Sequence, residues 1–336
     1  MSDVVYDLPE HAIAQRPVEP RDAARLLVDR GPSKGGEHRH VRDLPQLLQR
    51  GDLLVVNDTR VLPARLGLHR ITGGQVEVLL LERRNDTATR WAALVRPSRK
   101  IAVGEVVTAG PLQVRVGEKL DETGQREVEI LGEDPLGAIQ QHGQLPLPPY
   151  ITERPDDPDR YQTVYARRAA SAAAPTAGLH FTDDLLARLA DAGVGLARVE
   201  LVVGLDTFRP VAVEDPADHP MHTEAYRIPP ETIDALASAS RVVAVGTTSA
   251  RALESYGATG EGFGRTNLFI RRPYPWKYVD VLMTNFHLPR TTLLLMIDAF
   301  IGPRWRDLYE TALANDYRFL SFGDAMLLER NRDLQG

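Results

Sequence analysis

The pattern of apolar residues changes twice along the chain, and these changes constrain the fold most. Residues 52–57, DLLVVN, form a continuous apolar run after a short helical segment at 43–49. Such a run is typical of a strand buried on both faces of an α/β sheet. From about 61 to 148, short segments that alternate apolar and polar residues are separated by turn signals such as TGG and ETG. This spacing predicts antiparallel strands in a small barrel or sandwich.

Helical and extended segments alternate after residue 178. TDDLLARLADAG at 182–193 predicts a helix with a threonine N-cap, and GLARVELVVG at 195–204 predicts the strand that follows. The alternation continues with a capped helix at 229–239, strands at 241–246 and 278–285, and an apolar helix at 291–301. We therefore expect a mostly parallel sheet flanked by helices.

The first strand of this sheet precedes the strand-only segment, so we expect one unit to interrupt the other. The predicted α/β catalytic domain comprises residues 1–60 and 149–336, and residues 61–148 form an inserted antiparallel β-barrel domain. The proline-rich stretch LPLPPY at 145–150 marks the second boundary.

Composition excludes several classes of protein. The chain has no cysteine, which excludes disulfides, thiolate metal sites and cysteine nucleophiles. The N-terminus lacks the basic and apolar regions of a secretory signal, and no apolar run reaches the roughly 20 residues that span a bilayer. We therefore expect a cytoplasmic protein with no membrane partner. The net charge of −6 argues mildly against a nucleic-acid partner, although a local basic face can coexist with it.

Four polar stretches, two of which contain glycine, stand out from this background. They are NDTRVLPAR at 57–65, APTAGLHFT at 174–182, VGTTSAR at 245–251 and TNFHLP at 284–289. Together with RYQTVYA at 160–166, MHTE at 221–224 and YRFLSFGDAM at 317–326, and in this order, they resemble the S-adenosylmethionine:tRNA ribosyltransferase-isomerases of queuosine biosynthesis. The resemblance extends from about Tyr6 to Leu328.

This resemblance implies a reaction as well as a fold. Enzymes of the family transfer and isomerise the ribosyl group of S-adenosylmethionine onto 7-aminomethyl-7-deazaguanine at the tRNA wobble position. Adenine and methionine leave, and epoxyqueuosine-tRNA is formed. The family fold is an α/β domain with an inserted β-barrel. The resemblance also implies that S-adenosylmethionine is a co-substrate, that no prosthetic group or metal is needed, and that a monomer acts on the tRNA anticodon loop without an obligatory protein partner.

Three positions depart from the family pattern. Val202 and Asp206 replace a histidine and a glycine in the stretch before TFRPV, and Asp298 replaces a serine in the predicted helix at 291–301. These departures and the acidic balance keep two alternatives open. One is a paralogue that uses the same donor on a small-molecule 7-deazapurine. The other is an inactive RNA-binding module, which the intact APTAGLHFT and TNFHLP stretches disfavour.

The chemistry calls for general bases with pKa values near neutral. The sulfonium of the donor acidifies the adjacent 5′ carbon, and the acceptor amine must be neutral to attack. His180, His222 and His287 are the candidate catalytic residues because all three lie inside the motifs. The alternative for each is a structural histidine whose ring nitrogens bond the backbone.

Two of the motifs follow predicted strands, at the edge of an α/β sheet where ligands usually bind. A glycine turn followed by a capped helix start is predicted at Gly246, Thr247, Thr248 and Ser249. The free amides of such a helix start favour an anion such as a carboxylate or phosphate. Arg251 lies one helical turn further. The alternative is an ordinary helix cap.

The stretch after residues 52–57 supplies a second polar group at this edge. Asp58 can accept hydrogen bonds from the ring and amine N–H groups of a guanine-like base, Arg60 can hold a phosphate or carboxylate, and Asn57 lies beside them. The alternative is a turn that begins at Asp58, with Arg60 on the surface.

The remaining candidates for substrate binding lie in the other motifs. Thr176 and Gly178 belong to a small-residue loop that lets a flat ligand approach the backbone, and Phe181 either stacks on a base or belongs to the core. Asn285 lies within TNFHLP. Glu224 and Asp324 are either partners of the acceptor amine or structural carboxylates.

No metal site is predicted, because His219, His222 and Glu224 lack the spacing of a helical metal motif. For the RNA, basic residues in the barrel segment and a mixed basic and aromatic segment near 271–277 are the candidate contacts. These residues are Arg83, Arg84, Arg90, Arg96, Arg99, Lys100, Arg271, Arg272, Lys277, Tyr274 and Trp276. For most of the individual cations, the alternative of a solvated surface charge is favoured.

Overall fold

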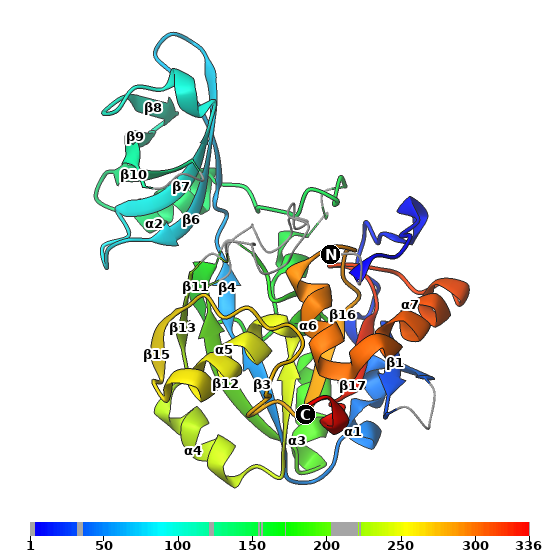
Figure 1. The fold of residues 1–336 in the computed structure, drawn as a ribbon. Coiled ribbons are helices and arrows are strands. Elements are labelled where there is room, and N and C mark those ends of the chain that lie inside the picture. Colours follow the sequence, from blue (N-terminus) through cyan, green and yellow to red (C-terminus); the bar gives the residue numbers. More distant parts are fainter. Residues whose placement is uncertain are drawn as a thin grey trace.

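The structure is a computed structural model that describes residues 4–31, 36–120, 124–153, 155, 157–171, 173–202, 221 and 223–335. It consists of a nine-stranded sheet with helices on both faces and a closed barrel of strands that projects from it (Figure 1). Two short strands, β4 (Thr59–Val61) and β11 (Arg168–Ser171), pair in parallel between these parts. The predicted fold class is confirmed. Within the described ranges, no helix has the length and apolar character needed to cross a bilayer.

The large sheet has the strand order β15-β13-β12-β3-β14-β16-β17-β1-β2. Its central pairs β12–β3, β3–β14 and β14–β16 are parallel, as is β17–β1, and antiparallel pairs complete the sheet. The sheet is thus mixed, with the predicted parallel pairing at its centre. The strands are β1 (Arg25–Asp29), β2 (Gly36–His40), β3 (Asp52–Asn57), β12 (Gly195–Leu201), β13 (Glu224–Arg227), β14 (Arg241–Val245), β15 (Phe263–Thr266), β16 (Val281–Asn285) and β17 (Ala325–Glu329).

Strand β3 shows why its sequence is a continuous apolar run. Val55 packs into the core on one face of the sheet, whereas Leu54 and Val56 pack into the core on the other face. Helices α4, α5, α6 and α7 cover the first face, and α1 and α3 cover the second (Figure 1). The helices are α1 (Leu44–Leu47), α3 (Asp183–Asp191), α4 (Pro230–Ser238), α5 (Gly246–Thr259), α6 (Thr292–Ile301) and α7 (Trp305–Ala314).

The six-stranded barrel closes in the order β10-β7-β6-β5-β8-β9. Alternate residues of its strands point inward, as in β9, where Leu112, Val114 and Val116 are buried. The strands are β5 (Arg65–His69), β6 (Gln75–Arg83), β7 (Arg90–Arg96), β8 (Val106–Ala109), β9 (Leu112–Lys119) and β10 (Gln125–Leu131), and helix α2 (Pro135–His142) follows them. We retain the division of the chain into domains 1–60 with 149–336 and 61–148 as a proposal.

The helix ends test the predicted caps. Thr182 caps α3 as predicted, and its Oγ1 accepts a hydrogen bond of 3.1 Å from the amide of Leu185. The predicted side-chain caps of α4 and α5 are wrong, because these helices begin after Pro229 and Val245, and neither residue makes a side-chain cap. The first amides of α5 are therefore not satisfied by an N-cap side chain.

Candidate active site

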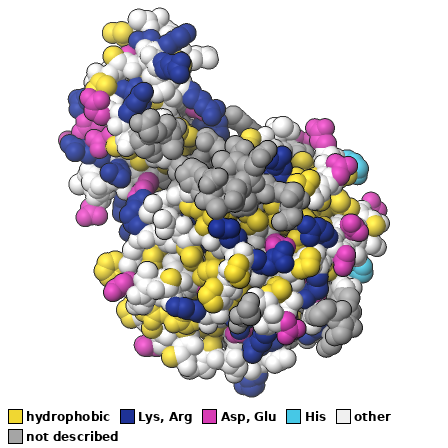
Figure 2. Space-filling model, viewed as in Figure 1, with side chains coloured by type: hydrophobic (Ala, Val, Ile, Leu, Met, Phe, Trp, Pro, Cys, Tyr) yellow, Lys and Arg dark blue, Asp and Glu magenta, His cyan; other side chains and the backbone are white. Residues whose placement is uncertain are grey.

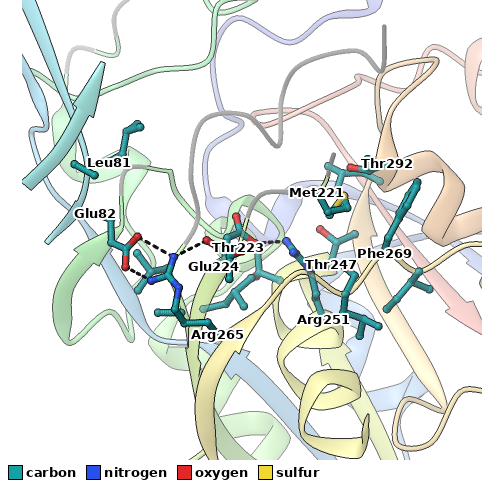
Figure 3. Close-up of a pocket in the computed structure, with 18 of the residues that line it drawn as sticks. Leu81, Glu82, Met221, Thr223, Glu224, Thr247, Arg251, Arg265, Phe269 and Thr292 are labelled. Carbon is teal, nitrogen blue, oxygen red and sulfur yellow. Dashed lines mark hydrogen bonds and ion pairs between the residues drawn. The ribbon is translucent and has the colours of Figure 1, made fainter. Parts of the chain in front are cut away.

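Two neighbouring cavities lie at the carboxyl ends of the central parallel strands. The larger cavity has a volume of about 400 Å³ and lies between the barrel, which contributes Leu81 and Glu82, and the sheet edge, which contributes Glu224 (Figure 3). The smaller has a volume of about 50 Å³. Thr247 and Thr248 line both cavities, so the start of α5 is their common wall.

The smaller cavity brings together three motifs that are far apart in the sequence. APTAGLHFT contributes Thr176, VGTTSAR contributes Gly246 with both threonines, and TNFHLP contributes Asn285 and His287. Thr176 donates a hydrogen bond of 2.9 Å to Oδ1 of Asn285, which links two of these motifs directly. Gly246 and Asn285 stand at the ends of the adjacent parallel strands β14 and β16, which explains why the motifs meet.

The start of α5 presents polar groups that have no partner in the described part of the chain. Thr247 is only 8% exposed and makes no side-chain hydrogen bond, and the buried Oγ1 of Thr248 also has none. Gly246 has a φ of 84°, which a side chain would disfavour, and this allows strand β14 to pass directly into the helix. By contrast, Ser249 is buried, and its Oγ donates to the carbonyl of Val245 at 2.7 Å.

His287 is held in the wall of the smaller cavity by two tyrosines. The hydroxyl of Tyr6 donates to its carbonyl at 2.5 Å, and its amide donates to the hydroxyl of Tyr309 at 3.0 Å. Its Nε2 lies 3.0 Å from Oγ1 of Thr284. Burial lowers the pKa of His287 to about 3, so the imidazole is neutral at pH 7.

His180 lines neither cavity within the described residues. Its Nδ1 lies 3.1 Å from the carbonyl of Ala177, and its Nε2 lies 2.9 Å from the carbonyl of Gly323. The pKa of His180 is lowered, mainly by burial. This geometry corresponds to the structural alternative given above. His222, like the departure at Asp206, lies outside the described residues.

Glu224 and Arg251 form a buried ion pair in the wall of the larger cavity (Figure 3). Arg251 also donates to the carbonyls of Leu268, at 3.0 Å, and Thr266, at 3.3 Å. The guanidinium predicted to hold an anion thus already has a carboxylate partner. A second ion pair, which the sequence did not reveal, joins Glu82 of the barrel to Arg265 of β15.

The structure does not bring Asn57, Asp58 and Arg60 to either cavity. Asn57 is fully buried, and its Nδ2 donates to the carbonyl of Leu201 at 3.0 Å, which ties β3 to the end of β12. Burial raises the pKa of Asp58, and the side chain of Arg198 lies 4.0 Å from it. Arg60 is half exposed, 3.7 Å from Asp159.

Three further candidates also lie outside the residues that line the two cavities. Gly178 packs against Tyr165, whose hydroxyl would lie 2.0 Å from a Cβ at this position, so its small size serves core packing. Phe181 is fully buried in the core, where it cannot stack on a ligand. Asp324 is 2% exposed, and its carboxylate accepts hydrogen bonds from the backbone amides of Arg25, at 2.9 Å, and Arg318, at 2.8 Å.

Sequence reasoning missed most of the apolar lining of the larger cavity. This lining includes Phe269 and Ile270, from the segment after β15, and Met296 of α6. Periodicity indicates that such residues are buried, but it does not distinguish the wall of a cavity from a filled core. In the described part of the chain, no three or more His, Asp or Glu side chains are grouped to hold a metal ion.

The predicted RNA contacts divide into two groups. In the barrel, Arg84, Arg90, Arg96, Arg99 and Lys100 are exposed, and Lys and Arg side chains are spread over its visible face (Figure 2).

In the second group, the prediction is wrong for Trp276. Trp276 is 6% exposed and donates to the carbonyl of Ala299 at 3.1 Å, so it is a core residue. Arg272 pairs with Asp298 at 2.6 Å, and Tyr274 donates to Glu254 at 3.3 Å. Asp298, one of the three positions that depart from the family pattern, therefore forms an ion pair with Arg272.

Comparison with known proteins identifies relatives along almost the whole chain. A family model described as queuosine biosynthesis protein matches residues 1–328. The chain is 50% identical over 327 residues to the S-adenosylmethionine:tRNA ribosyltransferase-isomerase of Rubrobacter xylanophilus, and the match covers 96% of each protein. It is also 50% identical to the enzyme of the same name from Moorella thermoacetica, covering 96% of this chain and 98% of the relative. The crystal structure of the S-adenosylmethionine tRNA ribosyltransferase of Thermotoga maritima is 36% identical, covers 97% of this chain and 99% of its own, and superposes with a TM-score of 0.56.

Proposed function

The chain belongs to the queuosine biosynthesis protein family, and we propose that it is an S-adenosylmethionine:tRNA ribosyltransferase-isomerase. In this function it transfers and isomerises the ribosyl group of S-adenosylmethionine onto 7-aminomethyl-7-deazaguanine at the tRNA wobble position, and it releases adenine and methionine. S-adenosylmethionine is a co-substrate, and the anticodon loop of tRNA is the partner. We further propose that the protein acts in the cytoplasm as a monomer.

The observation that carries this proposal is the convergence of APTAGLHFT, VGTTSAR and TNFHLP on one small cavity beside a larger one. These three motifs are among those by which the sequence resembles the family, and in the structure they supply polar side chains to the wall of the smaller cavity. The larger cavity, of about 400 Å³, falls in the range of ligand pockets, and its lining combines apolar side chains such as Met296 with the Glu224–Arg251 pair.

We propose His287 as the group that accepts a proton from the carbon beside the sulfonium. Its imidazole is neutral, its backbone is fixed by two tyrosine hydroxyls, and it lines the smaller cavity. The burial that keeps His287 neutral also opposes protonation, so the transfer requires a nearby negative charge in the complex. His180 is the positioning residue in this proposal, since both its ring nitrogens contact carbonyls. His222 remains a candidate outside the described residues.

The proposed RNA contact is made by the exposed arginines and lysine of the barrel. These side chains can neutralise backbone phosphates, while the wobble base enters the larger cavity between barrel and sheet. Because the wobble base already lies in a single-stranded loop, turning it into a cavity costs little unstacking energy.

A turnover assay tests the function. The protein is incubated with S-adenosylmethionine and an anticodon stem-loop that carries the aminomethyl-deazaguanine, and mass spectrometry follows adenine, methionine and the RNA. We expect release of both small products with a matching gain in RNA mass. Consumption of the donor only with a free deazapurine would establish a small-molecule paralogue instead. RNA binding without turnover would contradict the enzymatic function.

A pair of variants tests the role of His287. We expect His287→Gln to lower kcat at least 100-fold, because general base catalysis contributes roughly that much or more. His11→Gln is the matched control, since His11 is exposed and lines neither cavity. A fully active His287→Gln variant would remove this residue from the mechanism.

A further inference from the structure

We infer that the smaller cavity, at the N-terminus of α5, is a carboxylate subsite that holds the amino-acid end of the donor while its nucleoside occupies the larger cavity. The inference rests on the proposed function and deepens it by dividing the donor between the two cavities. It assigns Thr247 and Thr248 to one chemical group of the substrate.

The electrostatic character of the smaller cavity favours an anion. Its described lining contains no Asp, Glu, Lys or Arg, and the one imidazole, His287, is neutral. No carboxylate of the protein therefore repels a negative ligand from the cavity wall. Helix α5 has 14 residues, and its N-terminus places a partial positive charge of roughly half a unit at this point.

The hydrogen-bonding groups at this point are unused. The hydroxyl of Thr247 lies in a side chain that is more than nine-tenths buried, lines both cavities and has no partner within the described chain. The Oγ1 of Thr248 is also buried without a partner. Unpartnered buried hydroxyls also occur away from the two cavities, as at Thr163, so the position of these two hydroxyls decides. They stand in a cavity wall beside the first amides of a helix, where a ligand that accepts hydrogen bonds can use both.

The size of the cavity distinguishes a carboxylate from an RNA phosphate. A cavity of about 50 Å³ has room for only a few water molecules, at roughly 10–15 Å³ each, and a terminal carboxylate is of that size. A phosphodiester continues into a sugar on both sides and needs more room. Because the two cavities meet at Thr247, Thr248 and Leu293, one ligand can place its carboxylate in the first and its remainder in the second.

The neighbouring charges agree with this orientation. In the larger cavity, the carboxylates of Glu82 and Glu224 are present together with Arg84, Arg251 and Arg265, so a base and ribose with many donors and acceptors find partners there. A single terminal anion instead finds its unpaired donors at the start of α5. The donor molecule carries both kinds of group at its opposite ends.

The test compares two donors and two variants. Decarboxylated S-adenosylmethionine keeps the sulfonium and the nucleoside but lacks the carboxylate. Thr247→Val keeps the shape of the side chain and removes its hydroxyl. Thr163→Val is the matched control, because Thr163 is a buried threonine whose hydroxyl likewise has no partner in the described chain, yet it lines neither cavity.

We expect the wild-type enzyme and Thr163→Val to prefer S-adenosylmethionine over its decarboxylated analogue by at least tenfold in kcat/KM. Thr247→Val should lower kcat/KM for S-adenosylmethionine roughly tenfold, mainly through KM, and leave the value for the analogue within twofold, because a hydrogen bond to a charged group is lost only with the first donor. Equal losses for both donors would overturn the subsite. A weaker RNA affinity with an unchanged donor KM would assign the anion to the RNA and would also overturn it.

The proposed function and the subsite can fail separately. If the wild-type protein consumes neither donor, the function fails, and calorimetric titration with S-adenosylmethionine in the absence of RNA decides on the subsite. Weaker binding to Thr247→Val than to Thr163→Val supports the subsite, and equal binding to both variants refutes it.

Discussion

The buried, neutral imidazole of His287 predicts that the folded protein loses stability in mild acid. In the unfolded chain a histidine has a pKa of 6.5, whereas burial lowers the pKa of His287 to about 3. Between these two values the unfolded state binds more protons than the folded state. The free energy of unfolding therefore rises with pH in this range: the contribution of His287 is complete above about pH 6.5 and is lost progressively as the pH falls toward 3.

The magnitude follows from the two pKa values. Each pH unit between them changes the free energy of unfolding by up to about 1.4 kcal/mol. Acidification from pH 7 to pH 5 passes the unfolded-state pKa of 6.5 and ends about 1.5 pH units below it. The resulting loss of stability from His287 alone is about 2 kcal/mol. Burial also lowers the pKa of His180, so its contribution has the same sign and adds to the total.

Urea unfolding at a series of pH values measures this loss. Between pH 7 and pH 5, His287→Gln should lose about 2 kcal/mol less stability than the wild-type protein, because its side chain does not titrate. The comparison uses the pH dependence, so a constant destabilisation by the substitution does not disturb it. If His287→Gln is too unstable, His287→Asn serves the same purpose. Identical pH dependence in wild type and variant would refute the buried neutral state of His287.

Two further predictions concern ion pairs, one between an exposed arginine and a buried aspartate and one buried on both sides. We expect Asp298→Ser to lower the free energy of unfolding by about 2 kcal/mol in urea titrations. The reason is that Arg272 and the indole of Trp305 both lose the carboxylate that accepts their hydrogen bonds. An unchanged stability would show that these hydrogen bonds do not stabilise the fold. We expect Glu224→Ala to lower stability by roughly 3–5 kcal/mol, because Arg251 is left buried without its carboxylate. Thermal unfolding should then show partial recovery when Arg251→Met is added, and a further loss in the double variant would contradict this account.

The sequence predicted the architecture because its strongest signals are local. The apolar run of β3 alternates between two cores, and the threonine at 182 caps α3, as the pattern indicated. The candidate site was expected at the carboxyl ends of parallel strands, where ligands usually bind. A cavity lies at this edge beside β14 and β16, and Gly246 and Asn285 line it.

The same rule did not hold at β3, for a reason that depends on tertiary structure. Asn57 donates to the carbonyl of Leu201 on the neighbouring strand, and the chain continues into β4 rather than into a helix. Asn57, Asp58 and Arg60 therefore line neither cavity. Phe181 and Trp276 show a second limit. An aromatic residue in the sequence is equally compatible with stacking and with a filled core. The exposed fractions of Phe181 and Trp276, 0% and 6%, decide for the core.

The chain enters and leaves the barrel at a single point. The amide of Arg65 donates to the carbonyl of Gln144 at 3.1 Å, and the amide of Gln144 donates to the carbonyl of Arg65 at 2.9 Å. Gly143 has no room for a Cβ there, since it would lie 1.8 Å from the carbonyl oxygen of Pro63. Because the two ends are already joined in space, we propose that the intervening segment is a separate module, whose gain or loss would leave the order of strands in the large sheet intact.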